Sequence, residues 1–112
     1  MLNNVPETLD EAFTCLRDMA TPEELAEFLQ YGPNSYHHVL GRHLRNAWGF
    51  WRREGRLYEW LVSLGLQHPD DMSGLILESF HRHMQGCDLD LAGQVRHYQA
   101  FWAAVGVIHD EK

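Results

Sequence analysis

Residues 68–86, HPDDMSGLILESFHRHMQG, contain the start, the body and the end of one helix. Pro69 suits the first helical position, and Asp70 and Asp71 suit the first turn, where one can cap the helix and the other favours the helix dipole. Gly86 stands where a helix commonly ends in the left-handed conformation. Between these ends the apolar side chains recur at helical spacing, at Met72, Leu75, Ile76, Phe80 and Met84. The segment therefore predicts an amphipathic helix.

Two helix starts precede this segment near the beginning of the chain. Thr8 is followed three residues later by Glu11, and Thr21 by Glu24, which is the spacing of a capping box. Apolar residues at helical spacing follow each start, so we predict helices over residues 9–16 and 22–29, the second ending at Gly32-Pro33.

Two further helices are predicted after the middle of the chain. A short one over 57–64 ends at Gly65, and a last one over 91–105 begins after Asp88 or Asp90 and ends at Gly106. No segment alternates polar and apolar residues for long, so a sheet is not expected. We predict an all-α fold, a compact bundle of five or six helices that forms a single domain over residues 1–112.

The stretch 36–51 predicts one continuous helix, capped by Asn34 or Ser35, with an apolar stripe over four turns. The stripe comprises Tyr36, Val39, Leu40, Leu44, Ala47, Trp48 and Trp51. We expect its tryptophans to face the core and its arginines to face solvent and pair with the acidic start of the chain. Gly41 and Gly49 each cost about 1 kcal/mol in a helix interior, and close helix packing or a bend near Gly49 would explain them.

The formal net charge of −7 is unevenly distributed. Residues 1–30 carry seven acids against Arg17 alone, a net charge of −6, whereas residues 31–69 carry +3 and residues 70–112 carry −4. An acidic chain is repelled by phosphate, so direct nucleic-acid binding is not expected. The acidic residues of the first quarter are suited to a basic protein surface, and they are Glu7, Asp10, Glu11, Asp18, Glu23, Glu24 and Glu27.

Composition and targeting features favour a soluble, cytoplasmic protein with reduced thiols. Apolar types make up 45% of the residues, enough for a core, yet no apolar run approaches the roughly 20 residues of a membrane span. The first residues have neither the basic nor the apolar region of a signal peptide. Cys15 and Cys87 lie far apart, in no metal-binding pattern.

The eight histidines do not show the spacing of a helical metal site. His81 and His83 are two residues apart, which separates them by about 200° around a helix, and His37 and His38 are adjacent. The remaining ones are His43, His68, His97 and His109. No metal and no cofactor is predicted, although ligands brought together from different helices would escape this argument.

Polar residues of two segments form the other candidate site. Arg45 can reach the turn that contains Asp70 and Asp71 as an internal salt bridge, which would make the group a structural clasp; an open polar site for an enzyme or a ligand is the alternative. The group comprises Arg45, Asn46, Trp48, Trp51, His68, Asp70, Asp71 and Ser73, with His81 as a further candidate. No nucleophile motif or phosphate-binding loop accompanies it.

Three blocks together resemble an uncharacterised bacterial domain family of unknown function. They are Pro6-x-Thr8-Leu9-x-Glu11-Ala12, Leu40-Gly41-x3-Arg45-Asn46-x-Trp48-Gly49-x-Trp51 and His68-Pro69-Asp70-Asp71-x-Ser73. The resemblance extends from Pro6 to about Met84. It implies a bacterial or phage-borne origin and supplies no activity.

Three hypotheses of function follow. The first is a small acidic, non-enzymatic protein-binding module, of the kind found among inhibitors, immunity proteins and phage anti-CRISPR proteins, acting as a monomer or homodimer. Its partner is a larger protein, for example one with a basic nucleic-acid-binding groove. The second is a small enzyme or ligand-binding domain with its site at the polar group. The third is RNA or DNA binding through the arginines and tryptophans of residues 42–53.

Overall fold

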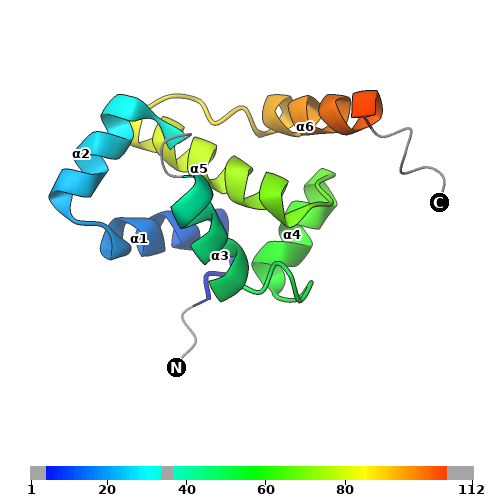
Figure 1. Cartoon of the computed structure of the whole chain (residues 1–112), viewed down its shortest axis with the longest axis horizontal. Helices are drawn as coiled ribbons and strands as arrows, with labels where there is room; N and C mark the ends of the chain where they lie inside the picture. The colour runs from blue at the N-terminus through cyan, green and yellow to red at the C-terminus, as the bar shows by residue number, and fades with distance from the viewer. Residues whose placement is uncertain (1–4, 34–36, 106–112) are drawn as a thin grey trace.

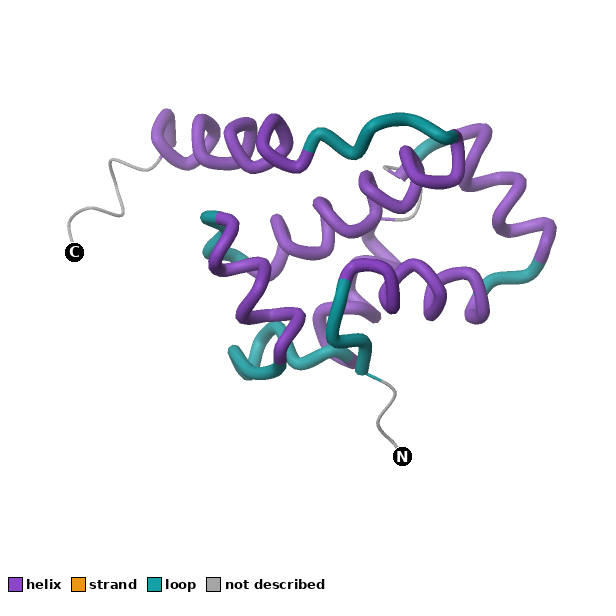
Figure 2. Tube along the Cα trace, turned by 180° about the vertical axis from the view of Figure 1, so that it is seen from behind, coloured by secondary structure: helices purple, strands orange, loops and turns teal. Residues whose placement is uncertain are grey.

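A central helix, α5 (Pro69–Gln85), organises the fold. The computed structural model describes residues 5–33 and 37–105, which contain six α-helices and no strand (Figures 1 and 2). The other elements are α1 (Leu9–Met19), α2 (Pro22–Tyr31), a π-helical turn η2 (His37–Gly41), α3 (Arg42–Ala47), α4 (Arg56–Leu64) and α6 (Leu91–Val105). The predicted all-α bundle is confirmed.

The helix ends near the start of the chain follow the predicted caps. The hydroxyl of Thr8 accepts a hydrogen bond from the N–H of Glu11 at 3.1 Å. Thr21 and Glu24 form a reciprocal capping box, with the Glu24 N–H donating to Thr21 Oγ1 at 3.1 Å and the Thr21 N–H donating to Glu24 Oε1 at 2.9 Å. At the far end of α5, Gly86 adopts a φ of +75°, as its position predicts.

Helix α5 lies in the core because its apolar side chains point to several sides. It contacts α1, α2, η2, α3 and α6. Its residues Met72, Leu75, Ile76 and Leu77 are completely buried, and such burial stabilises the fold by roughly 1.5–3 kcal/mol for each side chain. The core around them takes residues from α1 to α4 and from the segments that join these helices, and Val95 from α6.

The prediction of a continuous helix over 36–51 is wrong after Ala47. Helix α3 ends at Ala47, and Gly49 follows with a φ of +81°. The N–H of Phe50 donates to the carbonyl of Arg45 at 3.2 Å, which is the closing bond of a Schellman turn. Gly49 therefore ends the helix. Of the two reasons offered for a glycine at this position, a bend is nearer to the structure than close helix packing. Asn34, Ser35 and Tyr36 lie outside the described residues.

This early end changes which apolar residues of the segment are buried. Leu44 and Trp48 lie in the core, but Trp51 belongs to the following turn and is 52% exposed. Val39, in the π-helical turn, is 77% exposed. The prediction that both tryptophans face inward thus holds for Trp48 and is wrong for Trp51.

Helix α6 attaches to the rest of the domain through both apolar and polar contacts, with Val95 in the core and Leu91 and Tyr98 packed against it. Only Gln94 and Val95 of α6 are buried. The amide nitrogen of Gln94 donates to Ser79 Oγ at 3.0 Å and to the carbonyl of Leu89 at 2.9 Å. Both views place α6 along the side of α5 that faces away from α1 (Figures 1 and 2). Within the described part of the chain, no helix has the length and apolar character needed to cross a membrane.

Candidate functional site

The HPDD turn starts α5, but its cap differs from the one expected. The imidazole Nδ1 of His68 accepts the N–H of Asp70 at 2.9 Å, so His68 is the N-cap and neither aspartate is. Pro69 occupies the first position of the helix, and Asp70 and Asp71 lie in the first turn. This interaction requires Nδ1 to carry no proton, since the ring nitrogen acts as the acceptor.

Arg45 joins α3 to this turn, as predicted. Its Nη1 donates to Ser73 Oγ at 2.9 Å, and its Nε lies 3.3 Å from Asp70 Oδ1. The second contact has ion-pair distance without the alignment of a hydrogen bond. Ser73, completely buried, donates in turn to the carbonyl of Asp70 at 3.0 Å. We call Arg45, Asp70 and Ser73 the Arg45 clasp.

Asp71, the next residue of this turn, receives a hydrogen bond from α6. Trp102 Nε1 donates to Asp71 Oδ2 at 2.6 Å, and Asp71 is only 8% exposed. Burial raises the pKa of the Asp71 carboxyl, while the Trp102 hydrogen bond acts to lower it. Nothing in the spacing of the sequence shows that the N–H of Trp102 meets a carboxylate 31 residues away.

Three aromatic rings surround the start of α5. The His68 ring stacks on Trp102, with centroids 5.8 Å apart and planes at 22°, and meets Trp51 edge-on at 5.8 Å and 83°. Trp48, in contrast, packs against Phe50 in the core, and Asn46 is exposed. The structure therefore brings together six of the eight predicted residues and leaves Asn46 and Trp48 apart.

The polar atoms of this group are used in contacts with one another. The Arg45 side chain is 13% exposed and is engaged by Ser73 and Asp70, and the Asp71 carboxylate is engaged by Trp102. This arrangement favours the structural clasp over an open site for substrate, because a binding site needs polar ends that are free to meet a ligand. Asp70 is the exception, with a side chain that is 54% exposed.

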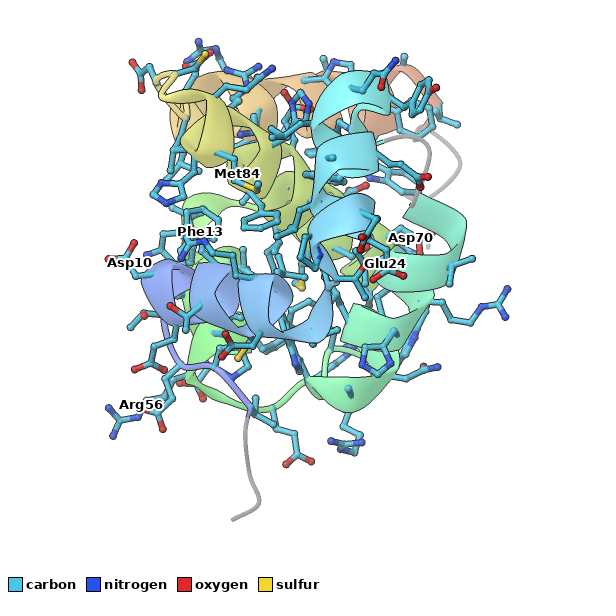
Figure 3. The ribbon with its side chains drawn as sticks, turned by 90° about the vertical axis from the view of Figure 1, so that its left-hand side faces the viewer. Asp10, Phe13, Glu24, Arg56, Asp70 and Met84 are labelled. Carbon is cyan, nitrogen blue, oxygen red and sulfur yellow. The ribbon has the colours of Figure 1, made fainter. Side chains whose placement is uncertain are left out.

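The seven acidic residues of the first quarter are all exposed. One lies just before α1, three lie near its two ends and three lie on α2; those of α1, from Asp10 to Asp18, span roughly 12 Å along the helix axis. Figure 3 shows Asp10 near one end of α1 and Glu24 on α2, with Phe13 between α1 and α5. Glu11 also accepts the N–H of Glu7 at 2.8 Å.

Among the residues that the structure describes, no ion pair joins an arginine to these acids, contrary to the expectation. The ion pair of Arg45 is with Asp70, and Arg52 lies 3.6 Å from Glu54, both outside the first thirty residues. Arg17 Nη2 lies 3.1 Å from His83 Nε2, in a hydrogen bond to α5.

Two hollows lie beside α1. The larger is a groove of about 760 Å³ between α1 and α3, and the smaller, of about 220 Å³, is lined mainly by apolar side chains from α1, α2, η2 and α5. Met19 lines both, so they are neighbours. Glu11 and Asp18 line the groove, and Glu24 lines the smaller hollow. Neither hollow was predicted from the sequence.

A third hollow, of about 310 Å³, lies between α5 and α6. Glu78, His97 and Tyr98 are among its lining residues. Burial, followed by the nearby carboxylates, raises the pKa of Tyr98 to about 12, so its hydroxyl stays protonated at neutral pH. Glu78 holds Arg82 at 2.7 Å.

The histidines have separate environments. His81 Nε2 lies 3.2 Å from the Leu29 carbonyl, and the His83 ring stacks on Phe13. The side chains of His37 and His38, and all of His109, lie outside the described residues. Among the residues that are described, no three His, Cys, Asp or Glu side chains are placed to hold a metal ion.

The fold and the Arg45 clasp define the class of protein. It is a small all-α domain in which Arg45 of the short helix α3 contacts the first turn of the central helix α5. Residues 5–84 match the family model described as Domain of unknown function (DUF6794), and the chain belongs to this family. The match includes every helix from α1 to α5, except the last residue of α5, and does not include α6. It confirms the resemblance to a family of unknown function. Comparisons with curated proteins and with solved structures found no match.

Proposed function

We propose that the chain is a non-enzymatic protein-binding module that docks the acidic surface of α1 and α2 on a basic surface of a larger protein. The single observation that carries the proposal is the exposure of all seven acidic side chains. Arg17 is the only basic residue among the first thirty, so the seven acids leave this part of the chain with a net charge of −6.

Electrostatics supports a protein partner with a positive surface. A concentrated field of one sign attracts a surface of the opposite sign and speeds diffusional encounter. A basic groove that binds nucleic acid attracts an acidic protein for the same reason, and a docked protein then blocks the groove. In this proposal the chain acts as an inhibitor or immunity-type protein.

The test compares two double charge reversals. Asp10→Lys/Glu23→Lys alters the acidic surface, and Glu54→Lys/Glu59→Lys makes the same change in net charge elsewhere on exposed positions. The partner is the protein that co-purifies from the native host, repurified and titrated by calorimetry. We expect the first variant to bind about tenfold more weakly and with less salt dependence, since each lost pair contributes up to about 1 kcal/mol and reversal adds repulsion.

The control variant should bind as the unaltered chain does. Equal affinity for the partner in all three proteins would refute the proposal. Binding lost equally in both variants would also refute it, because net charge rather than the acidic surface would then be responsible.

A further inference from the structure

Exposed apolar side chains gather at the two hollows beside α1. Val5 and Met19, 40% and 44% exposed, line the groove, and Val39, 77% exposed, lines the smaller hollow. Large apolar residues at the surface are unremarkable when scattered singly, but a group of them rimmed by polar residues is typical of an interaction site. Here they come from three separate parts of the chain.

Acidic side chains stand along the same groove. Glu11, Thr14, Cys15 and Asp18 line it from α1, at the i, i+3, i+4, i+7 spacing of one helix face. The carboxylates of Glu11 and Asp18 are therefore two turns apart, roughly 10 Å along the helix axis. His43, Ala47 and Trp48 form the opposite wall, from α3 and the residue that follows it.

We propose that the groove between α1 and α3 binds an amphipathic basic helix of the partner protein, with its apolar face in the groove and its Lys or Arg residues beside Glu11 and Asp18. This proposal rests on the proposed function and names the segment that the partner presents. Two basic residues seven positions apart on a helix have the same spacing as Glu11 and Asp18, so both pairs can form at once.

The chemistry of the groove favours this occupant over two others. A second copy that docks by this same face would bring carboxylates against carboxylates. A nucleic acid would do the same with its phosphates. Lys and Arg side chains combine an apolar stem with a charged end, which fits a groove with an apolar wall and an acidic rim.

The test uses three labelled synthetic helical peptides of equal length and measures binding by fluorescence polarisation. The first carries Leu at i, i+3, i+4 and i+7 with Lys on both sides, the second replaces every Lys by Glu, and the third replaces every Leu by Ser. We expect only the first to bind. Equal binding of the third would overturn the proposal, because charge alone would explain it, and so would binding of the second.

The two cysteines supply a footprint with an internal control. Cys15 lines the groove, whereas Cys87 follows α5 and is exposed away from it. Burial, and then Asp18 and Glu11, raise the pKa of the Cys15 thiol, so alkylation is followed by mass spectrometry in mildly alkaline buffer. The bound peptide should slow the alkylation of Cys15 and leave that of Cys87 unchanged. Unchanged alkylation of Cys15 under saturating peptide would place the binding elsewhere.

Three substitutions test the groove separately from the proposed function. Ala47→Trp fills the groove from an exposed position of α3, and Ala100→Trp makes the same change on an exposed position of α6. We expect Ala47→Trp and Asp18→Lys each to weaken the peptide about tenfold and Ala100→Trp to leave it unaffected. If Ala47→Trp binds the native partner normally while Asp10→Lys/Glu23→Lys does not, the groove proposal fails and the proposed function stands.

Discussion

Replacing Trp102 by Phe should weaken the fold in a pH-dependent way. The substitution keeps an aromatic ring beside His68 but removes the N–H that donates to Asp71 Oδ2 at 2.6 Å. A hydrogen bond to a charged group contributes about 1.5–3 kcal/mol, and Asp71 is 8% exposed, so water replaces the lost donor poorly. We expect a loss of about 2 kcal/mol near pH 7, or a Tm lower by roughly 10 °C.

The sign of the pH dependence follows from the pKa of Asp71. Burial raises it above the unfolded value of about 3.9, so folding favours the protonated carboxyl. The stability that this group contributes is therefore greatest below the unfolded pKa and is lost as the pH rises through the folded pKa. Trp102 lowers the folded pKa, so Trp102→Phe raises it further and deepens the loss.

Two independent measurements must agree. Urea unfolding between about pH 4 and pH 7 gives the destabilisation at each pH, and an NMR titration of the side-chain carboxyl carbon gives the pKa of Asp71 in both proteins. The destabilisation should grow with pH by about 1.4 kcal/mol for each unit by which the pKa rises. Trp51→Phe, at a 52% exposed tryptophan that meets His68 only by its edge, is the matched control. A destabilisation that is the same at both pH values, or an Asp71 pKa that does not move, would refute the reasoning.

Three further substitutions test other parts of the fold by thermal or urea unfolding. Arg45→Ala should cost about 1.5–3 kcal/mol because it removes the donor to buried Ser73, and Arg45→Lys should recover part of this; no loss in Arg45→Ala would mean that the clasp is not stabilising. Gly49→Ala should cost about 1–2 kcal/mol, since φ is +81° and a Cβ would lie 3.2 Å from the Glu54 carbonyl; a stability equal to the unaltered chain would contradict the Schellman turn. Thr21→Ala should cost about 1 kcal/mol through loss of the cap, and an unchanged Tm would show that the capping box is dispensable.

The helices with local start and stop residues were predictable from the sequence. Thr21 and Glu24 bond to each other's backbone within four residues, and Gly86 ends α5 by its own conformation. These interactions depend only on nearby residues, so the sequence contains all that determines them. The stretch 36–51 was predicted less well because its apolar spacing continues past Ala47, while the positive φ of Gly49 ends the helix there.

The contacts of the candidate site also divide into those that could be predicted from the sequence and those that could not. The Arg45 salt bridge was predictable because an arginine in a mostly apolar stretch needs a carboxylate, and the turn at Asp70 offered one. The bond between Asp71 and Trp102 was not, since it depends on where α6 lies. The groove beside α1 was also missed, because its walls come from residues that share no pattern in the sequence: one face of α1, part of α3, and Val5 and Pro6.

Two side chains hold the first turn of α5, and the family match includes one of them, Arg45, but not the other, Trp102. Arg45, Asp70 and Ser73 all lie within residues 5–84, so the clasp is internal to the family domain, whereas the donor to Asp71 comes from α6, outside the match. A carboxylate 8% exposed is costly to bury without a donor. The Trp102 bond therefore ties α6 to the family domain at the point where an unsatisfied charge would otherwise remain. The residues that line the groove beside α1 include none from α6, and so α6 can be fixed to the domain without forming part of the proposed docking surface.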